Sequence, residues 1–294
     1  MMLGVLGDLV EDIVVWVDEP IRYGTDCGGA QVFRTRGGSA ANVAAFAAER
    51  FPTRFFGCVG DDPAGDFVVQ NLVELGAEVV VQRRGTTGTI VLLIDENGER
   101  TMLPDRGASL LLRAVAQSDL RGLDLLHVPA YAFQGDDLRH EVVSTIHRAA
   151  KLGIPLSIDA SSAGMLTTFG ADRFLGLISE LKPEFLIANK DEAHVLGLSG
   201  SHAVNRLDAM PSTTVVLKNG AEATRLRRSD GLDISVPVPA VPDIRDSTGA
   251  GDAFAAGFLS TFLRNGDLTL ACEGGHALAA AVLHRPGASM APSC

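Results

Sequence analysis

Residues 246–258 read DSTGAGDAFAAGF. Two glycines flank an alanine, an aspartate follows, and an apolar, alanine-rich run of helical character comes next. Because glycine tolerates positive φ, Gly249 and Gly251 allow successive backbone N–H groups to turn inward. The beginning of the following helix adds partial positive charge. The stretch therefore predicts an anion hole at a helix N-terminus, suited to phosphoryl oxygens.

Asp252 falls in the first turn of this predicted helix, where the helix dipole favours its ionised form. An ionised carboxylate beside an anion hole can accept a proton from an attacking hydroxyl while the hole stabilises a transferring phosphoryl group. The same letters also fit a tight turn whose aspartate only caps the helix. They form neither a P-loop nor a complete dinucleotide-binding fingerprint, so the stretch alone leaves both interpretations open.

Outside this stretch, short apolar runs alternate with longer amphipathic ones. Strand–helix alternation over this length predicts a mostly parallel sheet with helices on both faces. The strand-like runs are residues 2–7, 53–60, 123–130, 154–161, 185–190 and 213–220, and the helical runs include residues 39–51, 63–76 and 136–153.

Two stretches interrupt the alternation. Residues 12–20 and 31–38 have the pattern of paired strands with no helix between them. Residues 89–104 have the pattern of a hairpin that turns at Asn97–Gly98, the strongest short turn signal. We expect these strands to form a small accessory sheet, although an edge extension of the main sheet is the alternative.

Composition limits the function further. The chain has 294 residues, of which 46% are hydrophobic and 21% charged, enough for a substantial core. Its net charge of -11 gives no overall basic footprint, so we expect no nucleic-acid partner. The short basic clusters at 83–84 and 225–228 are interpreted as solvated faces.

The four cysteines form no C-x-x-C pair, so neither a zinc site nor a redox motif is indicated. No apolar run approaches the ~18 residues of a membrane span, and the first residues lack a basic region typical of a secretion signal. We therefore expect a cytoplasmic protein without a membrane partner.

With these features in view, DSTGAGDAF resembles the C-terminal signature of the PfkB, or ribokinase-like, carbohydrate kinases, D-T-x-G-A-G-D. RGGSAANVA at 36–44 resembles their N-terminal signature, G-G-x-x-x-N-x-A, and lies about 200 residues earlier, as in that family. The resemblance covers nearly the whole chain, including GCVGDDPAGD, TGTIVLLIDENGERTM, NKDE and RPGAS.

The resemblance implies a ribokinase-like, three-layer α/β/α fold with a mostly parallel central sheet and a small β-sheet lid. The two interruptions of the alternation fall where the family inserts its lid strands. The implied main domain comprises residues 1–11, 38–87 and 106–294, and the implied lid comprises residues 12–37 and 88–105.

Roles for particular residues follow from the same resemblance. Asp252 is the implied catalytic base, and Gly249, Ala250 and Gly251 are the implied anion hole. The implied substrate-binding residues are Asp12, Gly37, Gly38, Asn42 and Arg106. Plainer interpretations stay open: Asp12 as a strand-end turn residue, Asn42 as a packed helix residue, and Arg106 as a partner of a nearby acid.

On the nucleotide side, NKDE matches the family's N-x-x-E motif, with Glu192 organising Mg²⁺ largely through water and Asn189 near the phosphates. A plain helix cap is the alternative. Lys218 and Gly220 match a nucleotide-binding turn. His276 matches an adenine-side position, although a histidine packed on its helix fits equally well. Asp246 and Thr248 match a monovalent-cation site, for K⁺, seen in some relatives.

The chain departs from the family pattern at two substrate positions and in the nucleotide-binding turn. Val10 stands where ribokinases favour a polar residue, and Pro129 and Ala130 stand where they carry an acid. Both argue against assignment as a ribokinase. Ala223 replaces a second glycine of the nucleotide-binding turn.

The resemblance implies an ATP- and Mg²⁺-dependent kinase of a small sugar or sugar derivative. A nucleoside kinase and a catalytically silent sugar- or nucleotide-binding protein are the alternatives; a dinucleotide-dependent oxidoreductase is disfavoured because no glycine fingerprint follows the first strand. An exposed apolar lid face would favour a homodimer through the lid, but the sequence does not fix the number of subunits.

Overall fold

The structure is a computed structural model. It describes residues 1–17, 19, 21, 23–26, 31–95, 100–199, 203–242, 244 and 247–284. The predicted turn at Asn97–Gly98, Asp246 and the RPGAS stretch at 285–289 lie outside the described residues.

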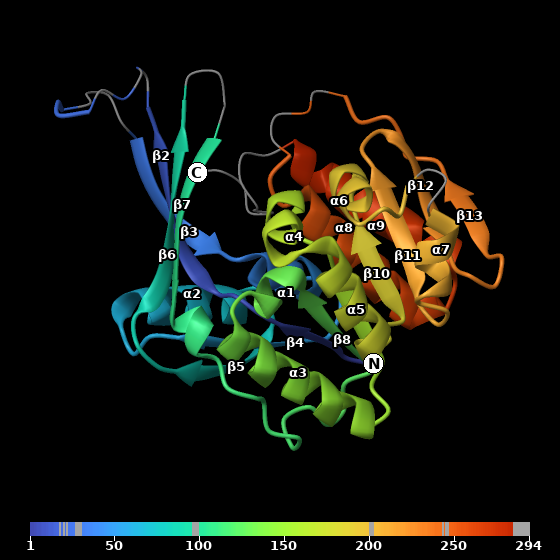
Figure 1. The fold of residues 1–294 in the computed structure, drawn as a ribbon. Coiled ribbons are helices and arrows are strands. Elements are labelled where there is room, and N and C mark those ends of the chain that lie inside the picture. The colour runs from blue at the N-terminus through green and yellow to red at the C-terminus, as the bar shows by residue number, and fades with distance from the viewer. Residues whose placement is uncertain are drawn as a thin grey trace.

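Two separate sheets organise the described part of the chain (Figure 1). The main sheet has nine strands in the order β13-β12-β11-β10-β9-β8-β1-β4-β5. Pairing is parallel from β11 to β5 and antiparallel where β12 and β13 extend one edge. Its strands are β1 (Leu3–Leu6), β4 (Thr53–Val59), β5 (Glu78–Arg83), β8 (Leu125–Pro129), β9 (Leu156–Asp159), β10 (Phe185–Ala188), β11 (Thr214–Asn219), β12 (Glu222–Arg227) and β13 (Asp233–Val236).

The second sheet, called the small sheet here, stands to the left of the main body in Figure 1. Its order is β3-β2-β6-β7, with β2 and β6 parallel and the outer pairs antiparallel. Its strands are β2 (Val10–Trp16), β3 (Gln31–Gly37), β6 (Thr87–Ile94) and β7 (Arg100–Gly107). A separate sheet, and not an edge extension of the main one, is therefore the arrangement that the interrupted alternation encodes.

Helices cover both faces of the main sheet. One face carries α1 (Ser39–Ala48), α2 (Pro63–Glu74), α8 (Ala250–Asn265) and α9 (Leu268–Leu283). The opposite face carries α3 (Asp136–Lys151), α4 (Ala163–Phe169), α5 (Ala171–Leu181), α6 (Lys190–Val195) and α7 (Ala203–Asp208). Two short 3₁₀ helices, η1 (Ala108–Leu111) and η2 (Ala130–Phe133), complete the elements. The predicted three-layer α/β/α fold with a mostly parallel central sheet and a small second sheet is confirmed.

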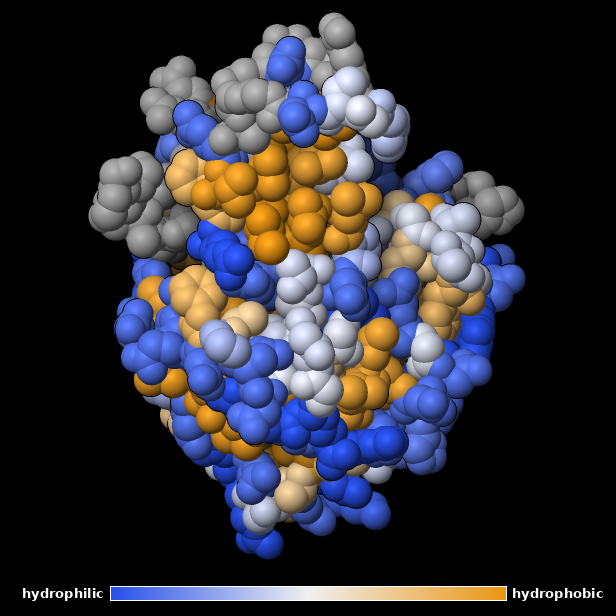
Figure 2. Space-filling view, turned by 90° about the vertical axis from the view of Figure 1, so that its left-hand side faces the viewer, coloured by the Kyte–Doolittle hydropathy of each residue, from blue (hydrophilic) through white to orange (hydrophobic). Residues whose placement is uncertain are grey.

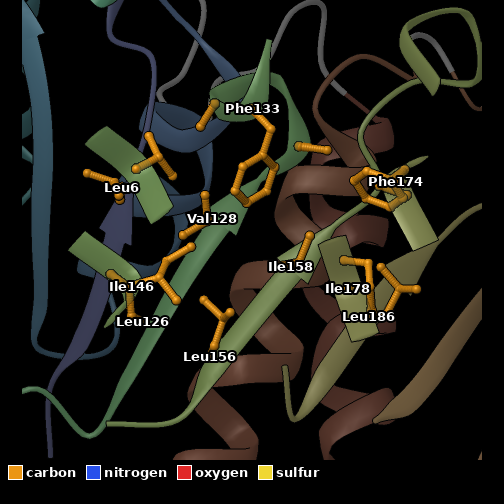
Figure 3. Close-up of a cluster of buried hydrophobic side chains, with 14 of the residues drawn as sticks. Leu6, Leu126, Val128, Phe133, Ile146, Leu156, Ile158, Phe174, Ile178 and Leu186 are labelled. Atoms are coloured by element: carbon orange, nitrogen blue, oxygen red, sulfur yellow. The ribbon is translucent and has the colours of Figure 1, made fainter. Parts of the chain in front are cut away.

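Apolar side chains fill both interfaces between the sheet and its helices. Figure 3 shows one of them, where strand residues meet α3 and α5. The strands contribute Leu6, Leu126, Val128, Leu156, Ile158 and Leu186, η2 contributes Phe133, and the helices contribute Ile146, Phe174 and Ile178. Continuous apolar runs such as Phe185–Ala188 are buried on both sides, as expected for the inner strands of a parallel sheet.

On the other face, α8 and α9 pack against each other at very close range. An ideal Cβ on Gly257 would lie 2.3 Å from the carbonyl oxygen of Gly274, and one on Gly275 would lie 2.8 Å from the Phe254 ring. Only glycine lets the two helix backbones approach this closely. The contact fixes the position of α8, the helix that the sequence singled out.

In the described part of the chain, no helix is both long and apolar enough to cross a membrane.

Candidate active site

Asp252 lies in the first turn of α8, which begins after Gly249. Gly249 is the N-cap, has φ of 76°, and provides no side-chain cap. The Asp252 carboxylate accepts a hydrogen bond from the Ser39 hydroxyl at 2.7 Å and one from Asn42 Nδ2 at 2.9 Å. Ser39 and Asn42 both belong to α1. The carboxylate is thus held across the molecule, which is not the contact made by a simple helix cap.

The electrostatics of Asp252 suit a group that exchanges a proton near neutral pH. Burial raises its pKa to about 6, although the hydrogen bonds from Asn42 and Ser39 lower it. Asp159 adds a further upward shift and Lys218 a downward one. At pH 7 the carboxylate is therefore mainly ionised, with a proton affinity close to the range in which a general base is most effective.

Asp12 and two glycines lie where the small sheet joins the main body. An ideal Cβ on Gly37 would lie 1.9 Å from Asp12 Oδ1, and one on Gly38, at φ of +100°, would lie 2.4 Å from the Asp8 carbonyl oxygen. Glycine at both positions lets the backbone pass beside the Asp12 carboxylate. Burial raises the pKa of Asp12 to about 7, while Arg36 lowers it. Among the described residues, the buried Oδ1 of Asp12 has no hydrogen-bond partner.

Lys218 lies beside the beginning of α8. Its Nζ is 3.1 Å from Asp159 Oδ2 and 5.9 Å from the centroid of the Phe254 ring, and an ideal Cβ on Gly251 would lie 3.4 Å from it. Burial lowers the pKa of Lys218, but Asp159 and Glu192 raise it more, so the net shift is upward. A permanent positive charge therefore lies next to the predicted anion hole.

Asn189 and Glu192 form a capping box at the start of α6. Asn189 Oδ1 accepts hydrogen bonds from the backbone N–H groups of Asp191 and Glu192, and Glu192 Oε2 accepts one from the Asn189 N–H at 2.8 Å. The plain-cap alternative is thus realised, and it orients the Glu192 carboxylate. Burial, with Asp159 nearby, raises the pKa of Glu192 to about 7.

Arg106 and His276 each have a partner within the protein. Arg106 makes a two-point ion pair with Asp8, Nε to Oδ2 at 2.7 Å and Nη2 to Oδ1 at 2.8 Å. Its guanidinium also donates to Gln134 Oε1 and to the Tyr131 carbonyl. His276 is 6% exposed, and its Nε2 lies 2.8 Å from Thr224 Oγ1. Arg106 is therefore paired with a nearby acid, and His276 is buried against Thr224 of β12 and the Phe254 ring of α8.

The remaining predicted residues lie in a turn and a loop of the main body. Gly220 has φ of +61° in the turn between β11 and β12, with no atom within 4 Å of an ideal Cβ. Thr248 is partly buried in the loop before α8. Within the described ranges, no three His, Cys, Asp or Glu residues group as ligands of a metal ion.

Sequence analysis missed three residues of this site. Ser39 lies inside the N-terminal signature and could have been marked as a partner of the base. Asp159 is the last residue of β9, and its register neighbour is Pro129, which stands where ribokinases carry an acidic residue. Carboxyl ends of parallel strands meet at one edge, so this acid had a detectable signal. Arg36, discussed below, had none.

Comparison with known proteins agrees with the geometry. The sequence pattern of the pfkB family carbohydrate kinases matches residues 3–294. The chain belongs to this family. The predicted class, an ATP-dependent sugar kinase, is thereby confirmed.

One relative and two solved structures show the extent of the similarity. It is 29% identical over 280 residues to the ATP-dependent ribose-1-phosphate kinase of Halopiger xanaduensis, covering 87% of this chain and 83% of that one. The crystal structure of adenosine kinase from Sinorhizobium meliloti superposes with a TM-score of 0.84 at 21% identity, over 98% and 94% of the two chains. A putative ribokinase II from E. coli, in complex with ATP and Mg²⁺, superposes with a TM-score of 0.82 at 17% identity, with the same coverage.

Proposed function

We propose that the protein transfers the γ-phosphoryl group of ATP to a hydroxyl of a small sugar or sugar derivative, with Asp252 as general base. The observation that carries the proposal is the placement of Asp252. It is an ionisable carboxylate with a pKa of about 6, held by Ser39 and Asn42, in the first turn of a helix that has no side-chain cap.

The acceptor sugar binds, in this proposal, between the small sheet and the main body. Asp12 Oδ1 is buried and has no partner among the described residues, which favours a ligand that donates a hydrogen bond. Sugar hydroxyls do so, and Asn42 adds a neighbouring amide. Gly37 and Gly38 allow the ligand to approach the backbone. Residues 12–37 and 88–105 would then act as a lid that excludes water, since ATP hydrolysis is the competing reaction.

The nucleotide binds on the other side of Asp252. The N–H groups at the start of α8, within Gly249–Gly251, have no intrahelical partners and form the proposed anion hole. The Ala250 N–H donates to the Ser247 carbonyl at 3.2 Å, a bond that it would exchange for a phosphoryl oxygen. Lys218 supplies positive charge to the phosphates. Asn189, Gly220 and His276 complete the proposed nucleotide side. In the transfer, the hydroxyl oxygen attacks the γ-phosphorus as its proton passes to Asp252 and the bond to ADP breaks.

Mg²⁺ would suit the acidic side chains of Glu192, on α6, and Asp159, at the end of β9. Glu192 and Asp159 repel each other electrostatically, which helps to raise the pKa of Glu192, and a divalent cation would relieve that repulsion. Because the described residues offer no closed set of three ligands, the ion would bind through water and the phosphates. Bound there, it would neutralise charge on the phosphates.

A monovalent cation at Asp246 and Thr248 belongs to the proposal as well. Thr248 directly precedes Gly249, so K⁺ held there would lie beside the anion hole. A several-fold rise in turnover on replacing Na⁺ by K⁺ is expected, and identical rates in the two salts would contradict this part.

Arg106 is proposed to contact an anionic group of the substrate, such as a sugar phosphate or carboxylate. Its ion pair with Asp8 means that such a group would have to exchange with the Asp8 carboxylate. We expect Arg106→Gln to raise the KM for ribose-1-phosphate and leave the KM for ribose unchanged. An equal change in both would mean that the arginine only holds the fold.

A nucleoside acceptor is the second candidate, and the small sheet favours it. Residues paired in register share one face of a sheet, so Val14, Trp16 and Phe33 lie on the same face as Asp12. Trp16 and Phe33 are 36% and 53% exposed. Aromatic surface next to a residue that binds sugar hydroxyls would suit the base of a nucleoside.

The opposite face of the small sheet is proposed to form a homodimer. It carries Ile13, Val15, Val32, Val91, Leu93 and Leu103. Val32 and Leu103 are 59% and 55% exposed, and Figure 2 shows a continuous hydrophobic patch on this side of the molecule. Sedimentation of the unmutated protein should give twice the mass of one chain, and sedimentation of Leu103→Glu should give the mass of a single chain. A monomeric unmutated protein would refute the dimer.

Transfer from γ-labelled ATP tests the function. Acceptors should include pentoses, hexoses, sugar acids, ribose-1-phosphate and nucleosides, with Mg²⁺ or with a chelator. We expect Asp252→Asn to lower turnover at least a hundredfold, with ATP affinity nearly unchanged. Near-normal turnover in this variant would remove Asp252 as the base, and no transfer to any acceptor would favour the silent-binding alternative.

A further inference from the structure

Arg36 is a buried arginine on β3 that links the small sheet to two helices of the main body. It is 6% exposed. Its Nη1 donates to Asn42 Oδ1 at 2.7 Å, and its Nε donates to Asn71 Oδ1, on α2, at 3.0 Å. The guanidinium thus contacts the same asparagine whose Nδ2 donates to Asp252.

This contact decides which way the Asn42 amide faces. An asparagine side chain has a donor at one end and an acceptor at the other, whereas a guanidinium has donors only and an ionised carboxylate acceptors only. With Oδ1 toward Arg36, Nδ2 must point to Asp252 Oδ2, where it lies at 2.9 Å. Rotation of the amide by half a turn would place donor against donor at Arg36 and acceptor against acceptor at Asp252.

The positive charge of Arg36 also favours the ionised form of Asp252. Burial lowers its pKa to about 10, with Asp12 and Asp252 opposing the shift, so it remains a cation at neutral pH. It lowers the pKa of Asp12 in return. The other titratable groups that influence Asp252 or are influenced by it are Asp159 on β9, Lys218 on β11 and Tyr131 on η2.

We propose that Arg36 is a positioning residue that locks the Asn42 amide with its donor toward Asp252 and so keeps the base ionised until it accepts the hydroxyl proton. This rests on the proposed role of Asp252. Arg36 itself need not touch either substrate. Because it belongs to the small sheet, the state of the base depends on how this sheet docks on α1 and α2.

The test is the pH profile of kcat, from pH 5.5 to 9, with saturating ATP and the best acceptor from the panel. In Arg36→Met the amide is free to rotate and the cation is lost. The midpoint of the acid limb should rise by about one pH unit, which gives about a fivefold loss of kcat at pH 6 and recovery by pH 9. Arg36→Lys keeps the charge without the two-pronged geometry, so its shift should be smaller.

Arg34→Met is the matched control. Arg34 lies on the same strand, with a side chain that is 68% exposed and paired with Glu11 at 3.4 Å. Its profile should match that of the unmutated protein. A loss of activity in Arg36→Met that is uniform across pH, with the midpoint unmoved, would overturn the proposal and leave only a packing role.

Two further variants separate the possible failures. If Asp252→Asn remains active, the proposed base is wrong and the role of Arg36 falls with it. If Asp252→Asn is inactive and the Arg36→Met midpoint does not move, only the present inference is wrong. If circular dichroism shows that Arg36→Met does not fold, Asn71→Leu replaces it, because it removes one hydrogen-bond partner of the guanidinium. A small upward shift of the acid-limb midpoint in Asn71→Leu would support the proposal, and an unmoved midpoint would refute it.

Discussion

Ser39→Ala offers a sharp test of how the candidate base is tuned. The Ser39 hydroxyl donates to Asp252 Oδ1 at 2.7 Å, a bond that stabilises the ionised carboxylate more than the protonated carboxyl. A hydrogen bond to a charged group contributes about 1.5–3 kcal/mol, and one pKa unit corresponds to about 1.36 kcal/mol. Loss of the hydroxyl should therefore raise the pKa of Asp252 by about one to two units from its value of about 6.

The sign of the effect follows from the role of a base, which acts only when it is ionised. Turnover rises as pH passes upward through the pKa, so a raised pKa moves the acid limb to higher pH. At pH 7 the ionised fraction should fall from about nine-tenths to between about a half and a tenth, and at pH 9 the two proteins should converge.

The assay is kcat against pH with γ-labelled ATP. Ser179→Ala is the control, because Ser179 lies on α5 and donates to the Ala209 carbonyl, away from Asp252. A folded Ser39→Ala protein whose acid limb coincides with that of the unmutated protein would refute the reasoning, since Asp252 would then not be the group that titrates.

Two further predictions concern stability. Gly257→Ala should lower the free energy of unfolding by about 1–3 kcal/mol in urea titrations, because its Cβ would meet the Gly274 carbonyl at 2.3 Å. Gly176→Ala, on α5 with no atom within 4 Å of an ideal Cβ, should instead raise it by about 0.5–1 kcal/mol; equal effects would contradict the close packing of α8 and α9. Glu192→Gln should stabilise the protein at pH 8 by about 1–3 kcal/mol and much less at pH 4, because a carboxyl whose pKa is raised from 4.5 to about 7 on folding destabilises the fold only above its unfolded pKa. A gain of the same size at both pH values would exclude titration of Glu192 as its cause.

Much of the fold could be predicted from periodicity. Continuous apolar runs marked the parallel strands, and runs without an intervening helix marked the small sheet. The antiparallel edge formed by β12 and β13 was not foreseen, although Asp233–Val236 alternates polar and apolar residues and its polar positions are the exposed ones. Strand β2 begins at Val10, two residues before the predicted start, since pairing with β3 continues to Gly37.

The candidate site was harder to predict because its contacts join distant segments. Ser39 and Asp252 are 213 positions apart, and Asp8 and Arg106 are 98 apart. Motifs indicated which segments matter, but the partner of each side chain depends on how helices and strands approach in space. Arg36 is the clearest case: nothing in a single sequence distinguishes it from the exposed Arg34, two residues earlier on the same strand.

The glycine contact between α8 and α9 has a consequence for how members of this family can diverge. Asp252 and the proposed anion hole lie at the first turn of a helix whose backbone packs directly against α9, where Gly257 and Gly275 have no room for a side chain. On the face of the small sheet that carries Asp12, Trp16 and Phe33 are less constrained, since they are 36% and 53% exposed. We expect substitutions there to change which hydroxyl compound is accepted, while the proposed phosphate-binding residues at the start of α8 stay the same.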